Sequence, residues 1–422
     1  MIFEDAEPPP GPPGALSRGL SGAQSGAHSG GPPDGAADSA ASIGACVALA
    51  IAGFATFMGM PLFVGAVIEQ FGFTEGQGGY LASAEYLGMF VASAVVSLLI
   101  LRINRRTLAL GGIALAIGAN AASILLTTLP QLLAVRFVSG LGCGTAYAVA
   151  VAVLAGTRQR VRNFSLLIFG QVLTNALVVL LFPYLIAAWH VPAIFVAYCA
   201  MLVAAGLSIR MLPPYHPAPA AAAPAHAALR RAVPWACLFG VFCFYLMIGA
   251  YWAYIERIGV SVGYDAIYVG RAISAGILLS LLACWAAYRL GRRWGQSRPL
   301  LLALAIVALA HLVGGAMPGP VAFLVGLALV NCFWNFTDIF QLGTMAHIDP
   351  TGVYASRIQG AQMLAMTISP AIAGFLLDKG LGYAHLLLLQ GGYVAAAFAT
   401  YALVYAYMRR AVPHLAEAHG AG

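Results

Sequence analysis

The feature that most constrains this chain is a succession of long apolar stretches between Ser42 and Tyr407. Each stretch has about 18 to 26 residues, enough for a helix to cross roughly 30 Å of bilayer hydrocarbon. Charged residues make up only 8% of the chain, whereas a soluble globular protein carries about 25%. The sequence therefore predicts an integral membrane protein.

The apolar stretches predict helices, because the strands of a membrane barrel would be shorter and would alternate in character. Twelve spans are expected. They cover residues 43–66, 79–101, 107–127, 130–154, 164–187, 190–211, 234–256, 265–288, 299–317, 320–343, 356–377 and 384–408. The predicted fold class is thus all-α, with twelve transmembrane helices.

The arginines predict how the chain is oriented, because short cytoplasmic loops retain positive charge during insertion. They cluster after the even-numbered spans, for example at Arg102 and Arg289, whereas the opposite loops contain only Arg257 and Lys379. Both termini are therefore expected to be cytoplasmic. Abundant Ala and a single lysine are typical of GC-rich bacterial genomes, so we expect a multi-pass protein of the bacterial inner membrane.

Segments rich in small residues and proline divide the chain. Residues 1–42 have the composition of a disordered cytoplasmic tail. A Pro/Ala-rich stretch, 212–233, is expected to be a cytoplasmic linker between two six-helix bundles at 43–211 and 234–408. Residues 409–422 are expected to form a second cytoplasmic tail.

The two predicted bundles repeat each other chemically at one constant offset. Loops between apolar spans must carry charge in any case, so coincidence is a competing explanation. Internal repeats are nevertheless common in transporters, and we favour duplication. The matched pairs are Arg102 with Arg289, Arg105 with Arg292, Arg106 with Arg293, and Glu69 with Glu256.

The loop after span 2, SLLILRINRR at residues 97–106, resembles the motif G-x-x-x-D-R-x-G-R-R of the major facilitator superfamily of secondary transporters. A second copy, CWAAYRLGRR, occupies residues 284–293. Both copies lack the motif's acid, which puts in doubt the charge-relay latch that the family usually forms there. The retained motif residues are Arg102, Arg105, Arg106, Arg289, Gly291, Arg292 and Arg293.

Span 4 keeps a second motif of that family, R-x-x-x-G-x-G, as Arg136, Gly140 and Gly142. The resemblance covers about residues 43–408 and is closest to generic bacterial members. It implies two pseudo-symmetric six-helix bundles that rock about a site between them. Polar and aromatic side chains within the spans are therefore the candidate site residues.

Glu85 in span 2 and Arg136 in span 4 lie at equal predicted depth, so they are able to pair. The pair is either a proton-coupling carboxylate held by an arginine or a static ion pair that fixes packing. Arg271 in span 8 lies at similar depth. It is a second candidate partner for Glu85, an anion-binding charge, or a side chain that snorkels to the interface near Asp265.

Span 10 carries a polar stripe on one helical face, formed by Asn331, Asn335 and Asp338, with Trp334 beside it. We expect this face to line the cavity between the bundles. Asp338 is a candidate for proton coupling. Alternatively, it pairs with Arg357 as a structural gate.

Two further polar pairs occur at helical spacing, Gln171 with Asn175 in span 5 and Gln359 with Gln362 in span 11. They are expected either to bind substrate or to hold helices together, at about 0.6 kcal/mol each.

Span 7 is rich in aromatic residues. Tyr245 is deep enough to stack an apolar part of a substrate together with Trp334. Tyr251, Trp252 and Tyr254 lie near the outer end, where we expect an interfacial aromatic belt.

No cofactor or metal is expected. The chain has no phosphate-binding GxxxxGK[ST] motif and no His or Cys pattern with metal-ligand spacing. The cysteines all lie in apolar spans and are expected to be packing thiols; they are Cys46, Cys143, Cys199, Cys237, Cys243, Cys284 and Cys332.

These features predict a secondary active transporter that moves a small organic solute, amphipathic or anionic, by alternating access coupled to protons. An uncoupled facilitator is the alternative within transport, and a receptor or scaffold on a transporter fold is the alternative outside it. No catalytic constellation indicates an enzyme. The expected partners are the solute, protons and the lipid bilayer, without nucleic acid, and we expect a monomer.

Overall fold

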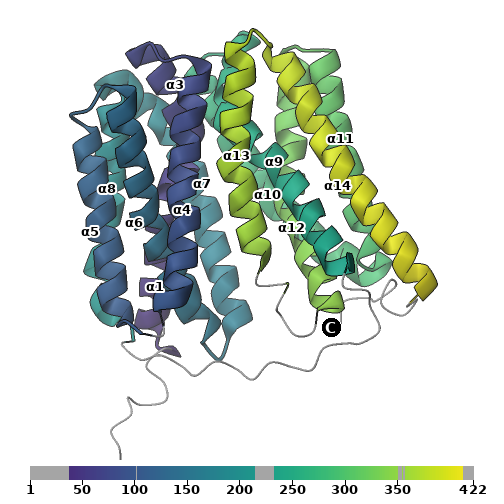
Figure 1. Ribbon diagram of the computed structural model, residues 1–422, viewed down its shortest axis with the longest axis horizontal. Helices are drawn as coiled ribbons and strands as arrows, with labels where there is room; N and C mark the ends of the chain where they lie inside the picture. The colour runs from purple at the N-terminus through teal and green to yellow at the C-terminus, as the bar shows by residue number, and fades with distance from the viewer. Residues whose placement is uncertain (1–37, 101, 214–231, 350–353, 355–356, 412–422) are drawn as a thin grey trace, which may run out of the picture. The chain divides into compact units, whose positions relative to one another are not determined.

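The computed structural model describes residues 38–100, 102–213, 232–349, 354 and 357–411, which form long helices joined by short turns (Figure 1). No strand occurs among these residues. Long helices are the expected form for apolar segments, because they satisfy their backbone hydrogen bonds internally. All described residues belong to one unit of packing contacts, Gly35–Gly422.

The first predicted span is three helices rather than one. The chain breaks at Phe54 and again at Gly59, where a Cβ atom would collide with Tyr198 and Phe182. The helices of this half are α1 Ala40–Gly53, α2 Ala55–Met58, α3 Met60–Phe71, α4 Glu75–Leu99, α5 Arg105–Ser123, α6 Leu129–Ala155, α7 Arg160–Trp189 and α8 Pro192–Leu207, followed by the 3-10 turn η2 Ile209–Met211.

The second half has six long helices. They are α9 Ala232–Ser261, α10 Ala266–Trp294, α11 Ser297–Ala316, α12 Pro320–Ile348, α13 Ile358–Asp378 and α14 Tyr383–Ala411. Within the described residues, ten helices are long and apolar enough to cross a membrane. The broken α1–α3 segment and α5 coincide with the other two predicted spans, so the predicted all-α fold of twelve membrane helices in two six-helix bundles is confirmed.

Close packing in the first half depends on small residues of α6. A Cβ atom at Gly140 would collide with the backbone oxygen of Glu85 on α4, and one at Gly142 would lie 2.5 Å from the backbone nitrogen of Ala116 on α5. These two glycines of the span 4 motif therefore let α6 approach α4 and α5 closely.

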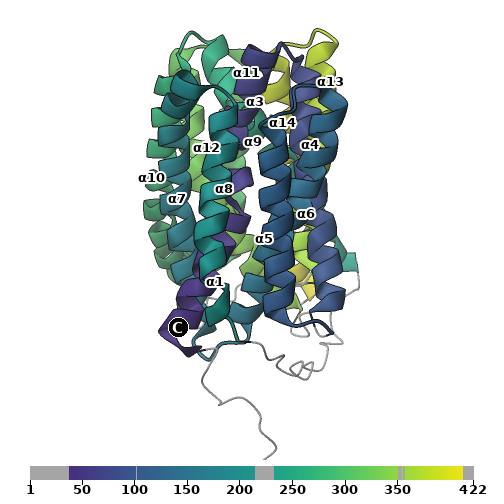
Figure 2. The same cartoon turned by 90° about the vertical axis from the view of Figure 1, so that its left-hand side faces the viewer.

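The two halves meet along α4 with α13, α7 with α10, and α3 with α9. Figure 1 shows α4 and α13 side by side where the blue and green halves join, and Figure 2 shows α7 beside α10. Most of the predicted tails and linker (1–42, 212–233 and 409–422) lies outside the described residues, so those boundaries remain predictions.

Candidate functional site

A cavity of about 340 Å³ lies between the two halves, and we call it the central cavity. Its wall comes from α2, α6 and α7 on one side and from α9, α10, α12 and α13 on the other. Of the eight predicted substrate-binding residues, all but Arg271 line it, together with Asp338. Those residues are Gln171, Asn175, Tyr245, Asn331, Trp334, Asn335 and Gln362.

Asp338 carries the formal charge of this cavity, because the other described residues in its wall are uncharged. The Tyr245 hydroxyl donates a 2.6 Å hydrogen bond to Asp338 Oδ2, and Trp334 Nε1 donates to the same hydroxyl at 3.4 Å. Asp338 Oδ1 is buried and has no hydrogen-bond partner among the described residues. One carboxylate oxygen is therefore held in place while the other is unsatisfied.

Arg357 does not pair with Asp338 in this structure. Its guanidinium lies 5.3 Å from the centre of the Trp235 ring and 5.1 Å from that of Tyr354. The alternative interpretation of Asp338 as one half of a gate with Arg357 is therefore not what the structure shows, and the carboxylate has no cationic partner among the residues that the structure describes.

The side-chain amides of the central cavity differ in whether their nitrogen and oxygen atoms have hydrogen-bond partners. Asn331 Nδ2 donates to the Leu327 carbonyl at 2.9 Å, and Asn335 Nδ2 donates to Ser280 Oγ at 3.3 Å. On α7, Gln171 Nε2 and Asn175 Oδ1 are buried without partners among the described residues. The α7 wall thus offers a donor and an acceptor to a bound solute.

Aromatic rings close the central cavity away from the arginine-containing loops. The Trp334 ring meets Phe57 and Trp252 edge to face, with ring centres 6.1 Å and 5.7 Å apart. Trp252 Nε1 also donates to the Phe57 carbonyl at 2.8 Å, so this wall joins the two halves. A solute in the central cavity would contact this aromatic wall at one end and the polar side-chain amides along the sides.

The predicted outer aromatic belt is wrong. Tyr251, Trp252 and Tyr254 are all buried rather than exposed to lipid. Trp252 and Tyr254 instead bond across the halves, the latter by donating from its hydroxyl to the Glu75 carbonyl at 2.6 Å. Aromatic residues near the end of a span resemble a belt in sequence, but here they pack between helices.

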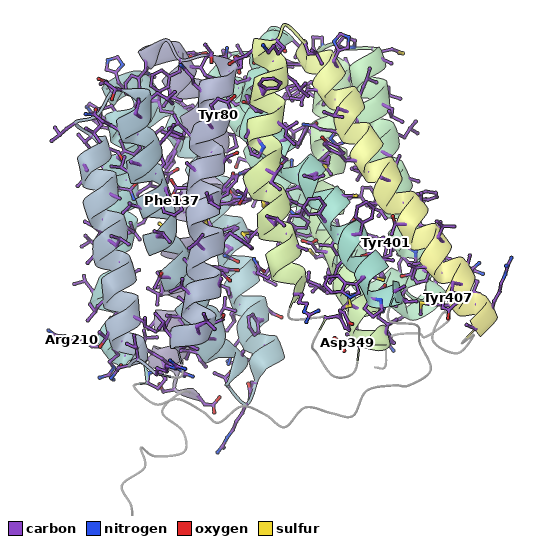
Figure 3. The ribbon with its side chains drawn as sticks, in the orientation of Figure 1. Tyr80, Phe137, Arg210, Asp349, Tyr401 and Tyr407 are labelled. Atoms are coloured by element: carbon purple, nitrogen blue, oxygen red, sulfur yellow. The ribbon has the colours of Figure 1, made fainter. Side chains whose placement is uncertain are left out.

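The central cavity leads towards the arginine-containing loops. A neighbouring hollow of about 420 Å³ shares Tyr147 and Gln171 with it and extends to Ser97 on α4, to Ile100 directly after α4, and to Phe164 on α7. These last three residues lie near the helix ends that adjoin the motif loop at 102–106. We call this the arginine-rich end, and Figure 3 shows Arg210 at the same end.

Ionic contacts join the two halves at the opposite end. Arg257 Nη1 donates to Glu69 Oε1 at 2.9 Å, and Arg257 Nε donates to Glu75 Oε1 at 3.3 Å. Asp378 accepts from Thr74 Oγ1 and from the Gly76 backbone N–H, both at 2.9 Å. We call Glu69, Thr74, Glu75, Arg257 and Asp378 the Arg257 latch. The sequence analysis did not predict this latch, because the sequence of a charged loop does not indicate which residue each charge will pair with.

Glu85 and Arg136 form the predicted ion pair, inside the first half and outside the central cavity wall. Arg136 Nη1 lies 3.2 Å from Glu85 Oε2, and both side chains are almost fully buried. Arg136 Nη2 donates to Asn120 Oδ1 at 3.0 Å and to Ser123 Oγ at 2.7 Å, while Ser139 Oγ donates to Glu85 Oε1 at 2.9 Å. The sequence analysis did not identify these three polar partners.

Arg271 is not among the residues that line the central cavity, and its anion-binding role stays a prediction. It is exposed on α10 and donates to the Tyr184 hydroxyl of α7, at 2.9 Å from Nε. It therefore contacts neither Glu85 nor the central cavity. Asp265 caps its own helix by accepting from the Tyr268 N–H at 2.8 Å.

The motif arginines contact aromatic rings and backbone at the arginine-rich end. Arg106 Nε donates to the Leu212 carbonyl at 2.6 Å, the guanidinium of Arg289 lies 4.9 Å from the Trp285 ring centre, and Arg292 Nη1 donates to the Tyr288 hydroxyl at 2.9 Å. Neither copy has the motif acid as a partner, so the usual acid–arginine relay is not formed from these residues.

A family model described as Major Facilitator Superfamily matches residues 45–355. No curated protein matches the chain by sequence. A solved structure of a nucleoside transporter, NupG, is similar with a TM-score of 0.67 at 11% identity, over 86% of this chain and 99% of that one. The POT family transporter PepTSo gives 0.68 at 11%, over 87% and 98%. A D-xylose–proton symporter gives 0.67 at 14%, over 88% and 97%. At these identities the similarity concerns the fold.

Proposed function

Since the chain belongs to the major facilitator superfamily, we propose that it moves a small organic solute by alternating access through the central cavity, coupled to protons at Asp338. Membership makes the chain a multi-pass membrane protein and a secondary transporter. The solute, the coupling ion and the residues that bind them are our proposal.

The observation that carries the proposal is the unsatisfied Oδ1 of Asp338 in the wall of a cavity without a basic side chain among its described residues. A buried carboxylate of this kind is costly unless a proton or a cationic group neutralises it. Protonation of Asp338 and binding of a solute would therefore take place in the same cavity, which supports coupling of proton and solute.

The same wall narrows the class of solute. Its charge disfavours the anionic solute that the sequence suggested. The Asp338 charge favours a neutral or cationic molecule. The aromatic wall favours an apolar part in that molecule, and the unpartnered Gln171 and Asn175 atoms favour hydrogen-bonding groups. Action as a monomer stays part of the proposal.

Alternating access requires that each end closes in turn. The Arg257 latch ties the halves at one end, and the central cavity leads to the other. We assign the arginine-rich end to the cytoplasm of a bacterial inner membrane, from the charge bias of the loops. On that assignment both termini are cytoplasmic and the described state is inward-facing.

Glu85 is the second candidate for proton coupling. Each of its oxygens already accepts a bond from Arg136 or Ser139, and the pair lies outside the central cavity. A proton would have to displace these partners. We therefore consider Asp338 the better candidate for proton coupling and assign the Glu85–Arg136 pair to packing.

The test uses sealed proteoliposomes that contain a pH-sensitive dye, to which amines, aromatic compounds, sugars and organic acids are added. We expect solute-dependent proton flux in the wild type and in Asp265→Asn, a control in which an exposed acid keeps its capping ability. The flux should be lost in Asp338→Asn. It should persist in the doubly neutral variant Glu85→Gln with Arg136→Gln.

The other outcomes assign the alternatives. Entry of labelled solute without proton movement, unchanged in Asp338→Asn, would make the protein a facilitator. Loss of flux in the Glu85 and Arg136 double variant but not in Asp338→Asn would show that the Glu85–Arg136 pair is the site of proton coupling. Absence of exchange for every solute, with folded protein in the vesicles, would favour a receptor or scaffold.

A further inference from the structure

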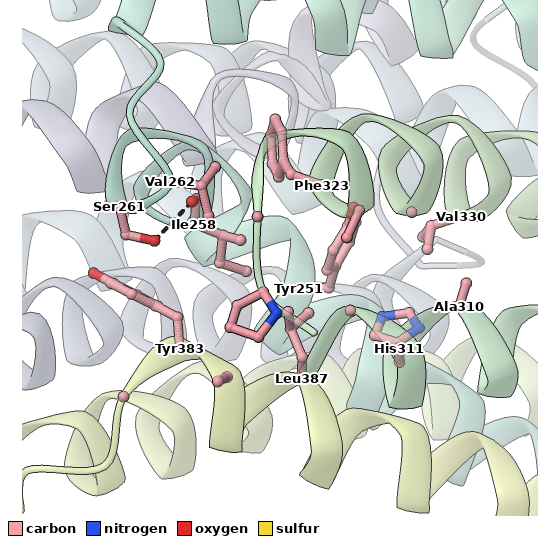
Figure 4. Close-up of a pocket in the computed structure, with 17 residues that line it drawn as sticks. Tyr251, Ile258, Ser261, Val262, Ala310, His311, Phe323, Val330, Tyr383 and Leu387 are labelled. Atoms are coloured by element: carbon pink, nitrogen blue, oxygen red, sulfur yellow. Dashed lines mark hydrogen bonds between the residues drawn. The ribbon is translucent and has the colours of Figure 1, made fainter. Parts of the chain in front are cut away.

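A second pocket lies inside the second half, apart from the central cavity. It has a volume of about 300 Å³ and is walled by α9, α11, α12 and α14 (Figure 4). It begins at the turns containing Pro318 and Gly382, on the side of the Arg257 latch, and reaches Val330 in mid-membrane. No residue lines both cavities. We call it the His311 pocket.

The walls of this pocket are mostly apolar, and their polar side-chain groups are the His311 ring and the hydroxyls of Tyr251, Ser261 and Tyr383. His311 on α11 is only 2% exposed, and its ring packs edge to face on Tyr251 with ring centres 5.2 Å apart. Nδ1 lies 2.9 Å from the Val307 carbonyl. Nε2 is buried and has no hydrogen-bond partner among the described residues.

The chemistry of His311 fixes what it offers a ligand. A carbonyl oxygen only accepts, so Nδ1 must carry the hydrogen. No ion pair holds a charge on this ring among the described residues, and an unpaired cation in apolar surroundings would be costly. The ring is therefore neutral, and Nε2 presents a lone pair that requires a donor.

We propose that the His311 pocket binds a small uncharged molecule that is mostly apolar and carries one hydrogen-bond donor, such as an alcohol or a phenol, which donates to His311 Nε2. The volume matches a ligand of about one aromatic ring with short substituents, at the lower limit for small-molecule sites. Apolar walls bury the body of the ligand, and the lone pair orients it.

Gly326 on α12 provides a way to block the site. It lines the pocket, and a Cβ atom there would find no heavy atom within 4 Å. A larger side chain at this position would therefore grow into the pocket without collision. Gly118 on α5 has equally open surroundings but lies in the other half, so it supplies the matched control.

The test measures binding of 4-fluorophenol to the full chain in lipid nanodiscs by fluorine NMR line broadening, with empty nanodiscs to correct for partition into lipid. Fluorobenzene, which lacks the donor, is the matched probe. We expect saturable binding of the phenol, weakened about tenfold by His311→Phe, which keeps a ring but removes the acceptor. Gly326→Leu should abolish it, while Gly118→Leu and Asp338→Asn should leave it unchanged.

Fluorobenzene should bind more weakly than the phenol and should not respond to His311→Phe. Equal phenol broadening in wild-type and empty nanodiscs would overturn the proposal, and water would then be what satisfies Nε2. Undiminished phenol affinity in His311→Phe would overturn it as well. If Gly326→Leu fails to fold, as judged by its melting temperature, His311→Phe still decides the matter.

Discussion

Arg136 is a buried cation whose position depends on several polar neighbours rather than on one acid. Its guanidinium contacts Glu85, Asn120 and Ser123, and it lies 4.8 Å from the centre of the Phe195 ring. Burying a charge is costly, and the cost is offset only when the group is paired and hydrogen-bonded. The polar cluster therefore holds α4, α5 and α6 in one arrangement.

At this scale we predict that Glu85→Gln destabilises the protein strongly, by about 3–5 kcal/mol, because it leaves Arg136 charged and unpaired. The double variant Glu85→Gln with Arg136→Gln should recover much of that loss. Thermal unfolding of the purified protein in detergent measures both. Glu69→Gln, at an acid that is 51% exposed, is the control and should change stability little. Equal melting temperatures for the single and double variants would contradict the prediction.

Helix packing in this protein is set by positions where a Cβ atom has no room. Gly140 faces the backbone of Glu85 and Gly88, so α4 and α6 meet almost backbone to backbone. Small residues drive such contacts in membranes, where the hydrophobic effect does not bring helices together. The glycines of the family motif in α6 are thus explained by packing.

We predict that Gly140→Ala separates α4 from α6 and lowers the melting temperature, with loss of folded protein on expression. Gly111→Ala on α5, where a Cβ atom meets nothing within 4 Å, should be neutral or gain up to about 1 kcal/mol from helix propensity. Differential scanning fluorimetry compares the two. A Gly140→Ala protein as stable as Gly111→Ala would show that this packing tolerates a methyl group.

Element by element, the sequence predicts what depends on hydropathy and helical period. The spans follow from apolar length, and the stripe of Asn331, Asn335 and Asp338 follows from spacing, which is why these residues were correctly expected to face one cavity. The break at Phe54 was not predicted, because apolar residues continue through it. The break at Gly59 does have a signal in the sequence, because Pro61 follows two positions later and predicts a bend in the first span. The error about Trp252 arose because an aromatic residue near a span end fits either lipid or a helix interface.

For the whole molecule, the conformational state depends on which end is closed by contacts between the two halves. The Arg257 latch crosses between the halves, and the glycines beneath it let the backbones touch. A Cβ atom at Gly79 of α4 would collide with the Pro370 carbonyl of α13, and one at Gly374 would lie 2.8 Å from the Gly76 Cα atom. No single segment of sequence shows such contacts, since each is made by residues about three hundred positions apart.

We predict that Arg257→Gln shifts the population towards a state open at the latch end. Two partly exposed ion pairs are lost, each worth about 0.2–1 kcal/mol, so the open fraction should rise several-fold. Electron–electron distance measurements between spin labels at Tyr80→Cys and Leu381→Cys, in a background without native cysteines, report this opening. Lys379→Gln, which removes a neighbouring charge outside the latch, should leave the distances unchanged. An unaltered distribution in Arg257→Gln would assign closure to backbone packing alone.

The exposure of the latch has a consequence of a different kind. Glu69 is half in water, and charges in water are screened over about 8 Å at physiological ionic strength and about 3 Å at 1 M salt. The central cavity and the Glu85 pair are shielded from this effect by burial. We therefore expect the same spin-label distances to lengthen in 1 M sodium chloride, and constant distances would contradict this. On the proposed assignment of the arginine-rich end to the cytoplasm, a cell moved from fresh to saline water would then have a carrier that opens outward more readily, with its solute and proton gradients unchanged.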